Sequence, residues 1–225
     1  MNNIPIFIVH YTPLVKRKKH MINELSKYNF DFTFEEKYNK EDLTKEDLKR
    51  FIGIKKSEIS LTCKHLNIYK KMVENDIDVG IIFEDDVTLY DNFENKLSDY
   101  YNQLPDDWGM FFFGSGWNLH VPEKLVKKSN KNVFLKSNQG MGLWSPECKY
   151  GGWPICGGST RCMDSYIIKK ETAQKIINYC NKGRIFRPFD LFLNQCFRDL
   201  NIKSYWGEPS LCRQDTFSSS IKGDD

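Results

Sequence analysis

The sequence predicts a single α/β domain with one mostly parallel sheet covered by helices on both faces. Short apolar runs alternate along the chain with longer segments of helical periodicity. A length of 225 residues suits one domain with a full hydrophobic core. No internal repeat or low-complexity linker divides the chain, so we expect one domain over residues 1–225.

The first half of the chain contains two buried apolar runs, "IPIFIV" and "VGIIF", each preceding or following a helical pattern. The segment that begins at Ser57 has apolar residues at helical spacing, with Ser57 as its expected N-cap. We therefore expect strands at 4–9, 29–36 and 79–83, helices at 14–28 and 57–76, and a charged, partly helical surface segment at 39–51.

The second half continues the alternation. The expected elements are strands at 108–116, 164–170 and 203–208, and helices at 171–183, which Gly183 ends, and at 190–201. Ligands of such folds bind at the carboxyl ends of the strands. The site is therefore expected where these strands end.

Composition excludes several classes of protein. Lys and Arg number 33 against 30 Asp and Glu, and this small excess gives no reason to expect a nucleic-acid partner. Neither a signal peptide nor an apolar run near the ~18 residues of a membrane span is evident, so we expect a cytoplasmic protein without a membrane span. The seven cysteines contain no C-x-x-C pair, which favours free thiols over a disulfide framework or a zinc ribbon.

Three consecutive acids, Glu84, Asp85 and Asp86, directly follow the apolar run 79–83. Carboxylates packed this closely raise one another's pKa unless a cation or hydrogen-bond donors neutralise them. An acidic turn exposed to solvent is the simpler alternative. The third acid favours a ligand site, and Mg²⁺ or Mn²⁺ held by one or two carboxylates together with a substrate diphosphate suits this pattern.

Five segments, in this order and spacing, resemble glycosyltransferase family 25: "SLTCKHLNIYKKM", "VGIIFEDDVTL", "DSYIIKKETAQKII", "FRPFDLFLNQ" and "YWGEPSLCRQ". The resemblance extends from Pro5 to Gln214. It implies a GT-A type fold with a single Rossmann-like sheet and a Mn²⁺ (or Mg²⁺) cofactor. It also implies transfer of a hexose, usually galactose, from a UDP-sugar with inversion. The acceptor would be a hydroxyl of a glycan or of a hydroxylysine-type protein side chain.

The same resemblance assigns roles to the acids. Asp86 corresponds to the direct metal ligand, Asp85 to the residue facing the ribose, and Glu84 to the residue facing the donor sugar. Many relatives have an Asn-Leu pair and then arginines after the first strand, where this chain has Val9, His10 and Tyr11 and then Arg17. Nucleotide contacts from His10, Tyr11 and Arg17 are therefore expected, although this departure weakens any inference about the base.

Two further residues are candidates for the site. His65 lies in a helix whose counterpart in the family also carries a histidine, so it either lines the donor pocket or is a packed core residue. Asp190 follows Pro188 at a helix start, where it is either an N-cap or the general base that inverting transferases of this fold place there. Asp164 and Glu208 are the next candidates for the base.

The segment 140–160 is rich in glycine and tryptophan, and is expected to be a sugar-binding lid or a long surface loop. Residues 215–225 read as a polar tail. Two other functions stay open from the residues alone: a metal-dependent phosphotransferase or phosphohydrolase, and an inactive nucleotide-sugar-binding module. No Walker loop supports the first.

Overall fold

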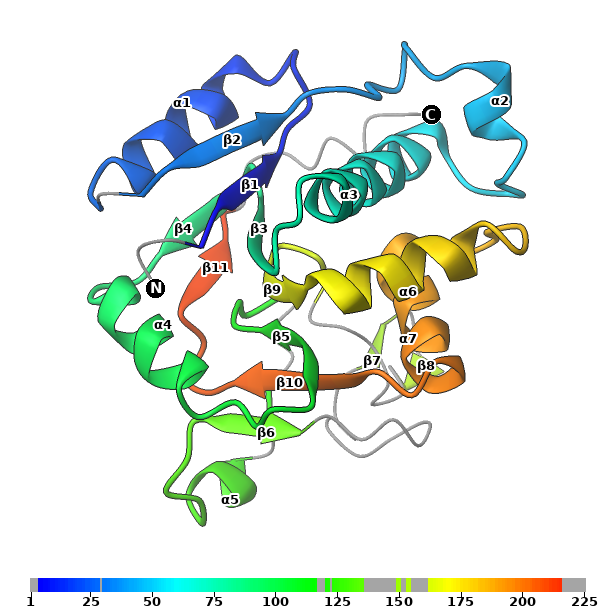
Figure 1. Ribbon diagram of the computed structural model, residues 1–225. Coiled ribbons are helices and arrows are strands. Elements are labelled where there is room, and N and C mark those ends of the chain that lie inside the picture. The colour runs from blue at the N-terminus through cyan, green and yellow to red at the C-terminus, as the bar shows by residue number, and fades with distance from the viewer. Residues whose placement is uncertain are drawn as a thin grey trace.

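A computed structural model describes residues 4–28, 30–116, 120–121, 123–135, 149–150, 153–154 and 162–215. Its centre is a sheet of seven strands in the order β2-β1-β3-β9-β5-β10-β6 (Figure 1). These strands are β1 Ile6–Val9, β2 Phe32–Glu35, β3 Val79–Glu84, β5 Trp108–Phe112, β6 Val133–Leu135, β9 Ser165–Lys169 and β10 Lys203–Gly207. Two small antiparallel sheets pair β4 Val87–Leu89 with β11 Cys212–Gln214, and β7 Lys149–Tyr150 with β8 Trp153–Pro154.

The helices lie on both sides of the central sheet, as the sequence predicts. They are α1 Val15–Leu25, α2 Lys45–Leu48, α3 Lys56–Glu74, α4 Phe93–Tyr101, α5 Glu123–Val126, α6 Lys170–Cys180 and α7 Phe189–Asp199. Figure 1 shows α1 and α4 on one side of the sheet and α3, α6 and α7 on the other. The expected α/β class with helices on both faces is therefore confirmed.

The central sheet divides the hydrophobic core into two clusters, one on each of its faces. Successive strand side chains point to opposite faces, so Phe7 and Ile82 join the cluster under α3, α6 and α7. Their neighbours Ile6 and Ile81 join the cluster under α1 and α4. Because both faces are buried, the strands read as continuous apolar runs in the sequence.

Five strands of the sheet, β2, β1, β3, β5 and β10, run in one direction, whereas β9 and β6 run in the other. The mostly parallel sheet is thus found, with an antiparallel strand at its centre. Because β9 pairs antiparallel with β3, its first residue, Ser165, lies opposite Phe83 near the end of β3. The residues before β9 therefore reach the same edge of the sheet as the acids after Phe83.

The start of α3 differs from the expectation. The helix begins at Lys56 with Lys55 as its N-cap, so the assignment of Ser57 as the N-cap is wrong. The Glu58 carboxylate accepts a hydrogen bond from the Lys55 backbone N–H at 3.4 Å, which supports the earlier start. Within the described part of the chain, the side-chain hydroxyl of Ser57 makes no hydrogen bond.

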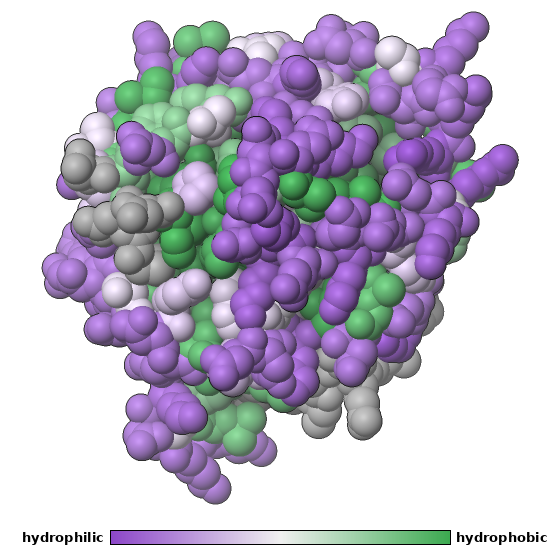
Figure 2. Space-filling view, viewed as in Figure 1, coloured by the Kyte–Doolittle hydropathy of each residue, from purple (hydrophilic) through white to green (hydrophobic). Residues whose placement is uncertain are grey.

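Polar residues cover most of the face of the molecule shown in Figure 2, with hydrophobic residues exposed between them in small groups. Over the part of the chain that the structure describes, no helix is long and apolar enough to cross a membrane. Cys63, Cys180 and Cys196 are free thiols, in agreement with the expectation, and Cys148 and Cys156 lie outside the described residues.

Candidate active site

The three acids lie at the carboxyl ends of two adjacent parallel strands. In the register of β1 and β3, Val9 lies opposite Glu84, the last residue of β3. The residues after β1, His10 and Tyr11, are thereby placed beside Asp85. The edge of the sheet at which such folds bind ligands is therefore the edge that carries the acids.

Asp85 is held by three groups from the first part of the chain. Its Oδ2 lies 2.6 Å from His10 Nδ1 and accepts a longer hydrogen bond, at 3.4 Å, from the Tyr11 backbone N–H. Its Oδ1 accepts a hydrogen bond from Arg17 Nη1 at 2.9 Å, and the same nitrogen lies 3.0 Å from Asp86 Oδ2. The structure thus brings together His10, Tyr11 and Arg17, which the sequence proposes for the site, around Asp85.

Arg17 is the cation shared by Asp85 and Asp86, and all three side chains are buried. Removing one partner of a buried ion pair leaves an uncompensated charge, so we expect Arg17→Met to lower the free energy of unfolding by about 3–5 kcal/mol. Lys18→Met is the matched control, because Lys18 pairs with Glu36 at the surface, where such pairs contribute about 1 kcal/mol or less. Urea unfolding of both variants measures the difference, and equal losses would contradict the role of Arg17.

Glu84 and Asp86 form the second part of the acidic triplet. Gln214, at the end of β11, lies with its Nε2 3.3 Å from Glu84 Oε2 and 3.5 Å from Asp86 Oδ1. Burial raises the pKa of Glu84 to about 7, and the charges of Asp85 and Asp190 add to this effect. Burial and then the Glu84 charge raise the pKa of Asp86 to about 7, against the opposing effect of Arg17. A solvated acidic turn would not show such shifts.

Asp164 is a fourth acid at this edge, immediately before β9. It is fully buried, its Oδ2 accepts a hydrogen bond from Ser165 Oγ at 2.8 Å, and its Oδ1 has no hydrogen-bond partner among the residues that the structure describes. Its backbone carbonyl accepts a hydrogen bond from the Glu84 N–H at 2.8 Å. Gly114 lies against it, and a Cβ at this position would come within 2.1 Å of Asp164 Oδ2. The glycine that ends "FFFG" therefore makes room for the acid.

The pKa of Asp164 is raised to about 8 by burial and, next, by the Glu84 charge. Because the folded state then binds this proton more tightly than the unfolded chain, its contribution to stability is complete below about pH 4 and is lost as the pH rises through 8. We expect Asp164→Asn to gain stability relative to the wild-type protein over this range. The gain should exceed about 1.4 kcal/mol, the equivalent of one pKa unit. The free energies of unfolding of both proteins at pH 5 and pH 8 test this. An equal change between the two pH values in the wild-type protein and in Asp164→Asn would contradict it.

His65 is a packed core residue, as one of the two alternatives from the sequence has it. It is fully buried in α3, with its ring stacked on Phe189 at 5.8 Å between centroids. Its Nδ1 lies 2.9 Å from the Tyr166 hydroxyl, and its Nε2 lies 3.9 Å from Glu84 Oε1. Burial lowers the pKa of His65 to about 3, so the ring is neutral at pH 7. His65 is thus a packed residue that also borders the acids.

Asp190 is in the first turn of α7, but it is not the N-cap. Pro188 occupies that position, and Asp190 Oδ1 accepts a hydrogen bond from the next backbone N–H, that of Leu191, at 2.8 Å. The N-cap alternative is therefore wrong. The Asp190 charge contributes to the raised pKa of Glu84, and its side chain is half-buried. The structure thus places the Asp190 charge near enough to act on Glu84.

Glu208 directly follows β10, three strands along the sheet from β3, and two other expected features lie mostly outside the described residues. Glu208 accepts a hydrogen bond from the Val121 N–H at 2.9 Å and lies 3.3 Å from His120 Nδ1. Of the segment 140–160, only the backbone of β7 and β8 is described, and residues 216–225 of the expected tail are not. The boundaries of the single domain stay a prediction.

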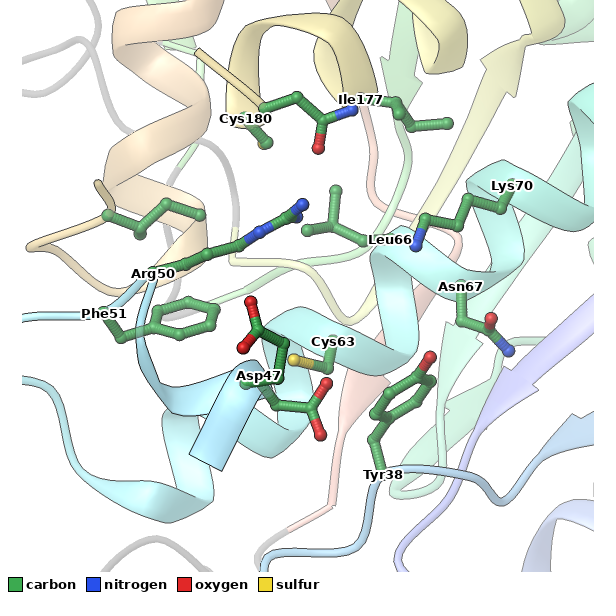
Figure 3. A pocket seen from close by; sticks show the side chains of 13 residues that line it. Tyr38, Asp47, Arg50, Phe51, Cys63, Leu66, Asn67, Lys70, Ile177 and Cys180 are labelled. Carbon is green, nitrogen blue, oxygen red and sulfur yellow. The ribbon is translucent and has the colours of Figure 1, made fainter. Parts of the chain in front are cut away.

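A pocket on the opposite side of α3 is separate from the acids. Figure 3 shows it between α2, α3 and the end of α6, with side chains such as Arg50, Cys63 and Lys70 around it. None of the residues that line it belongs to the predicted site. Its position on the outer face of α3 follows from helical periodicity, because His65 lies on the inner face that packs on the sheet.

Comparison with known proteins shows the family to which this chain belongs. Residues 3–193 match glycosyltransferase family 25, described as an LPS biosynthesis protein. The chain belongs to this family. The family is one of glycosyltransferases.

Two curated proteins are related to this family 25 chain. A putative glycosyltransferase of Haemophilus influenzae is 25% identical over 223 residues, covering 93% of this chain and 70% of that protein. Human procollagen galactosyltransferase 2 is 23% identical over 154 residues, covering 67% of this chain. The match covers only 21% of the human protein's length.

Two solved glycosyltransferase structures are also similar to the family 25 chain. One, at a TM-score of 0.39 and 14% identity, is a glycosyltransferase involved in glycosylation of the major capsid of PBCV-1, with 78% of this chain and 64% of that chain covered. The other, at a TM-score of 0.39 and 11% identity, is mouse xyloside xylosyltransferase 1 in its apo form. The match covers 88% of this chain and 70% of that chain.

Proposed function

We propose that the chain is an inverting hexosyltransferase of GT-A type that moves galactose from UDP-galactose to an acceptor hydroxyl. The acceptor is a hydroxyl of a glycan or of a hydroxylysine-type protein side chain. The observation that carries the proposal is the set of four carboxyl groups, Glu84, Asp86, Asp164 and Asp190, whose charges act on one another at the ligand-binding edge of the sheet. The galactosyltransferase named among the relatives supports the choice of sugar.

The carboxylate oxygens of this site suit a hard divalent cation, Mn²⁺ or Mg²⁺. Carboxylate oxygens are the ligands such cations prefer. Burial is the main cause of the raised pKa of Asp86, and the nearby charges of Glu84 and Asp85, which add to it, would attract a cation. Within the described ranges, no group of three His, Cys, Asp or Glu side chains is arranged to hold an ion. Asp86 would therefore hold the cation together with the donor diphosphate and water. When bound, the cation would offset the charge of the leaving UDP.

The remaining residues bind and orient the substrates. Asp190 takes the proton from the acceptor hydroxyl as that oxygen attacks the anomeric carbon on the face opposite UDP. Glu84 accepts a hydrogen bond from the donor sugar, and Asp85 faces the ribose. The contacts of His10 and Arg17 with Asp85 hold this wall of the nucleotide pocket in place, and Tyr11 borders it.

A thermal-unfolding screen of UDP-, GDP- and CMP-sugars, each with and without Mn²⁺, tests the donor. Binding to the folded state alone raises stability by about 2.7 kcal/mol at a ligand concentration of 100 Kd. We expect this stabilisation from UDP-galactose or UDP-glucose, and only when Mn²⁺ is present. Stabilisation by a CMP-sugar instead, or without any dependence on Mn²⁺, would contradict the proposal.

A further inference from the structure

A buried chain of hydrogen bonds leads from the core to the acids and ends at His65. The Tyr69 hydroxyl, from α3, lies 2.8 Å from the Tyr166 hydroxyl of β9. The Tyr166 hydroxyl in turn lies 2.9 Å from His65 Nδ1. All three side chains are fully buried. The other ring nitrogen, His65 Nε2, has no hydrogen-bond partner among the described residues and faces Glu84 Oε1 at 3.9 Å.

The number of protons on these three side chains determines which group donates in each hydrogen bond. Each tyrosine hydroxyl carries one proton, and a neutral imidazole carries one proton on one of its two nitrogens. If Tyr69 donates to Tyr166 and Tyr166 donates to His65 Nδ1, both hydroxyl protons have acceptors. The proton of His65 is then on Nε2, which faces the Glu84 carboxyl group.

In the forward direction the one donor without a hydrogen bond is His65 Nε2–H, which faces an acid. The reverse direction is less favourable at both ends of the chain of groups. With His65 Nδ1 donating to Tyr166 and Tyr166 donating to Tyr69, the Tyr69 proton would have no acceptor within the part of the chain that is described. A buried donor without a partner is unfavourable. In addition, the lone pair of His65 Nε2 would face the ionised carboxylate of Glu84, and the two would repel each other.

We infer that the Tyr69–Tyr166 pair fixes His65 in the tautomer with its proton on Nε2, and that this N–H positions the Glu84 carboxylate for the donor sugar. The inference rests on the role of Glu84 in the proposed function. The separation of 3.9 Å is longer than a hydrogen bond, and hydrogen bonds in active sites are often long without ligand and tighten when the ligand binds. Burial keeps the imidazole neutral, so the tautomer, and not the charge, is what the tyrosines set.

Long-range proton–nitrogen NMR on ligand-free protein with ¹⁵N-labelled histidine measures the tautomer directly. The chain has four histidines, and the signals of His65 are those that disappear in His65→Gln. We expect the proton on Nε2 in the wild-type protein and a mixture of both tautomers in Tyr166→Phe, which loses only a hydroxyl. Tyr205→Phe, whose hydroxyl lies 3.4 Å from Asp107 instead, should leave the His65 signals unchanged.

A wild-type proton on Nδ1, or an unchanged tautomer in Tyr166→Phe, would overturn the inference. Because this measurement needs no substrate, its failure is distinct from failure of hexosyl transfer, which would appear as a wild-type protein without turnover. For an active wild type, His65→Leu should raise the KM for UDP-galactose at least several-fold with a smaller change in kcat. His65→Gln, which retains an N–H donor, should recover part of the loss. Equal KM values in His65→Leu and wild type would contradict the positioning role.

Discussion

Replacing Asp190 with Asn is expected to lower turnover by roughly two to four orders of magnitude, the usual contribution of a positioned general base. Donor affinity should be unchanged, because Asp190 is proposed to contact the acceptor hydroxyl and not the nucleotide or its metal. The amide of Asn keeps an oxygen that can accept the hydrogen bond from the Leu191 N–H. The substitution therefore removes basicity and keeps the local structure of α7. Steady-state kinetics with a verified acceptor measure kcat, and titration calorimetry measures donor affinity.

Asp199→Asn at the other end of α7 is the matched control. Asp199 contacts Tyr179 and Arg198 at the surface, far along the helix from the acids, so its variant should keep wild-type turnover. If Asp190→Asn also retains near-normal turnover, the base is another residue. Asp164 would then be the first alternative, since it lies at the same edge of the sheet.

Asp86→Asn is expected to abolish the Mn²⁺ dependence of UDP binding while leaving the protein folded. The amide has the shape of the carboxylate and lacks the charge that a hard cation requires. Calorimetric titration of UDP in the presence and absence of Mn²⁺ measures this loss. Asp91→Asn, an exposed acid in the turn before α4, is the control and should bind UDP like the wild-type protein. Metal-dependent affinity that persists in Asp86→Asn would assign the ligand elsewhere.

The sequence predicts the part of the site that depends on local patterns. The apolar run before Glu84 identifies β3, and its parallel pairing with β1 places the acids and His10 at one edge. It names Asp164 as a further candidate for the base but does not explain its place at this edge, because alternation of strands and helices implies a parallel strand where β9 is antiparallel. Only this reversal brings the residue before β9 to the end of β3.

The sequence also does not predict which residues contact the predicted site residues. Asp85 is bound by His10 and Arg17, which are 75 and 68 positions away along the chain. Similarly, the link between His65 and Tyr166 spans 101 positions and depends on how α3 packs on β9. Residue type and local periodicity carry no information about such long-range contacts, whereas strand register and helix packing determine them.

The most direct test of the hexosyltransferase function follows UDP-galactose, in which the sugar is α-linked, by proton NMR with the protein and Mn²⁺. An inverting transferase passes the sugar to an acceptor hydroxyl, or slowly to water, in the β configuration. We therefore predict that UDP and β-galactose or a β-galactoside appear first, and much more slowly with Asp190→Asn. Release of galactose 1-phosphate or inorganic phosphate would indicate a phosphohydrolase, and bound but unreacted donor would indicate a sugar-binding module. Either of these results, or a product with the α configuration, would contradict inverting hexosyl transfer.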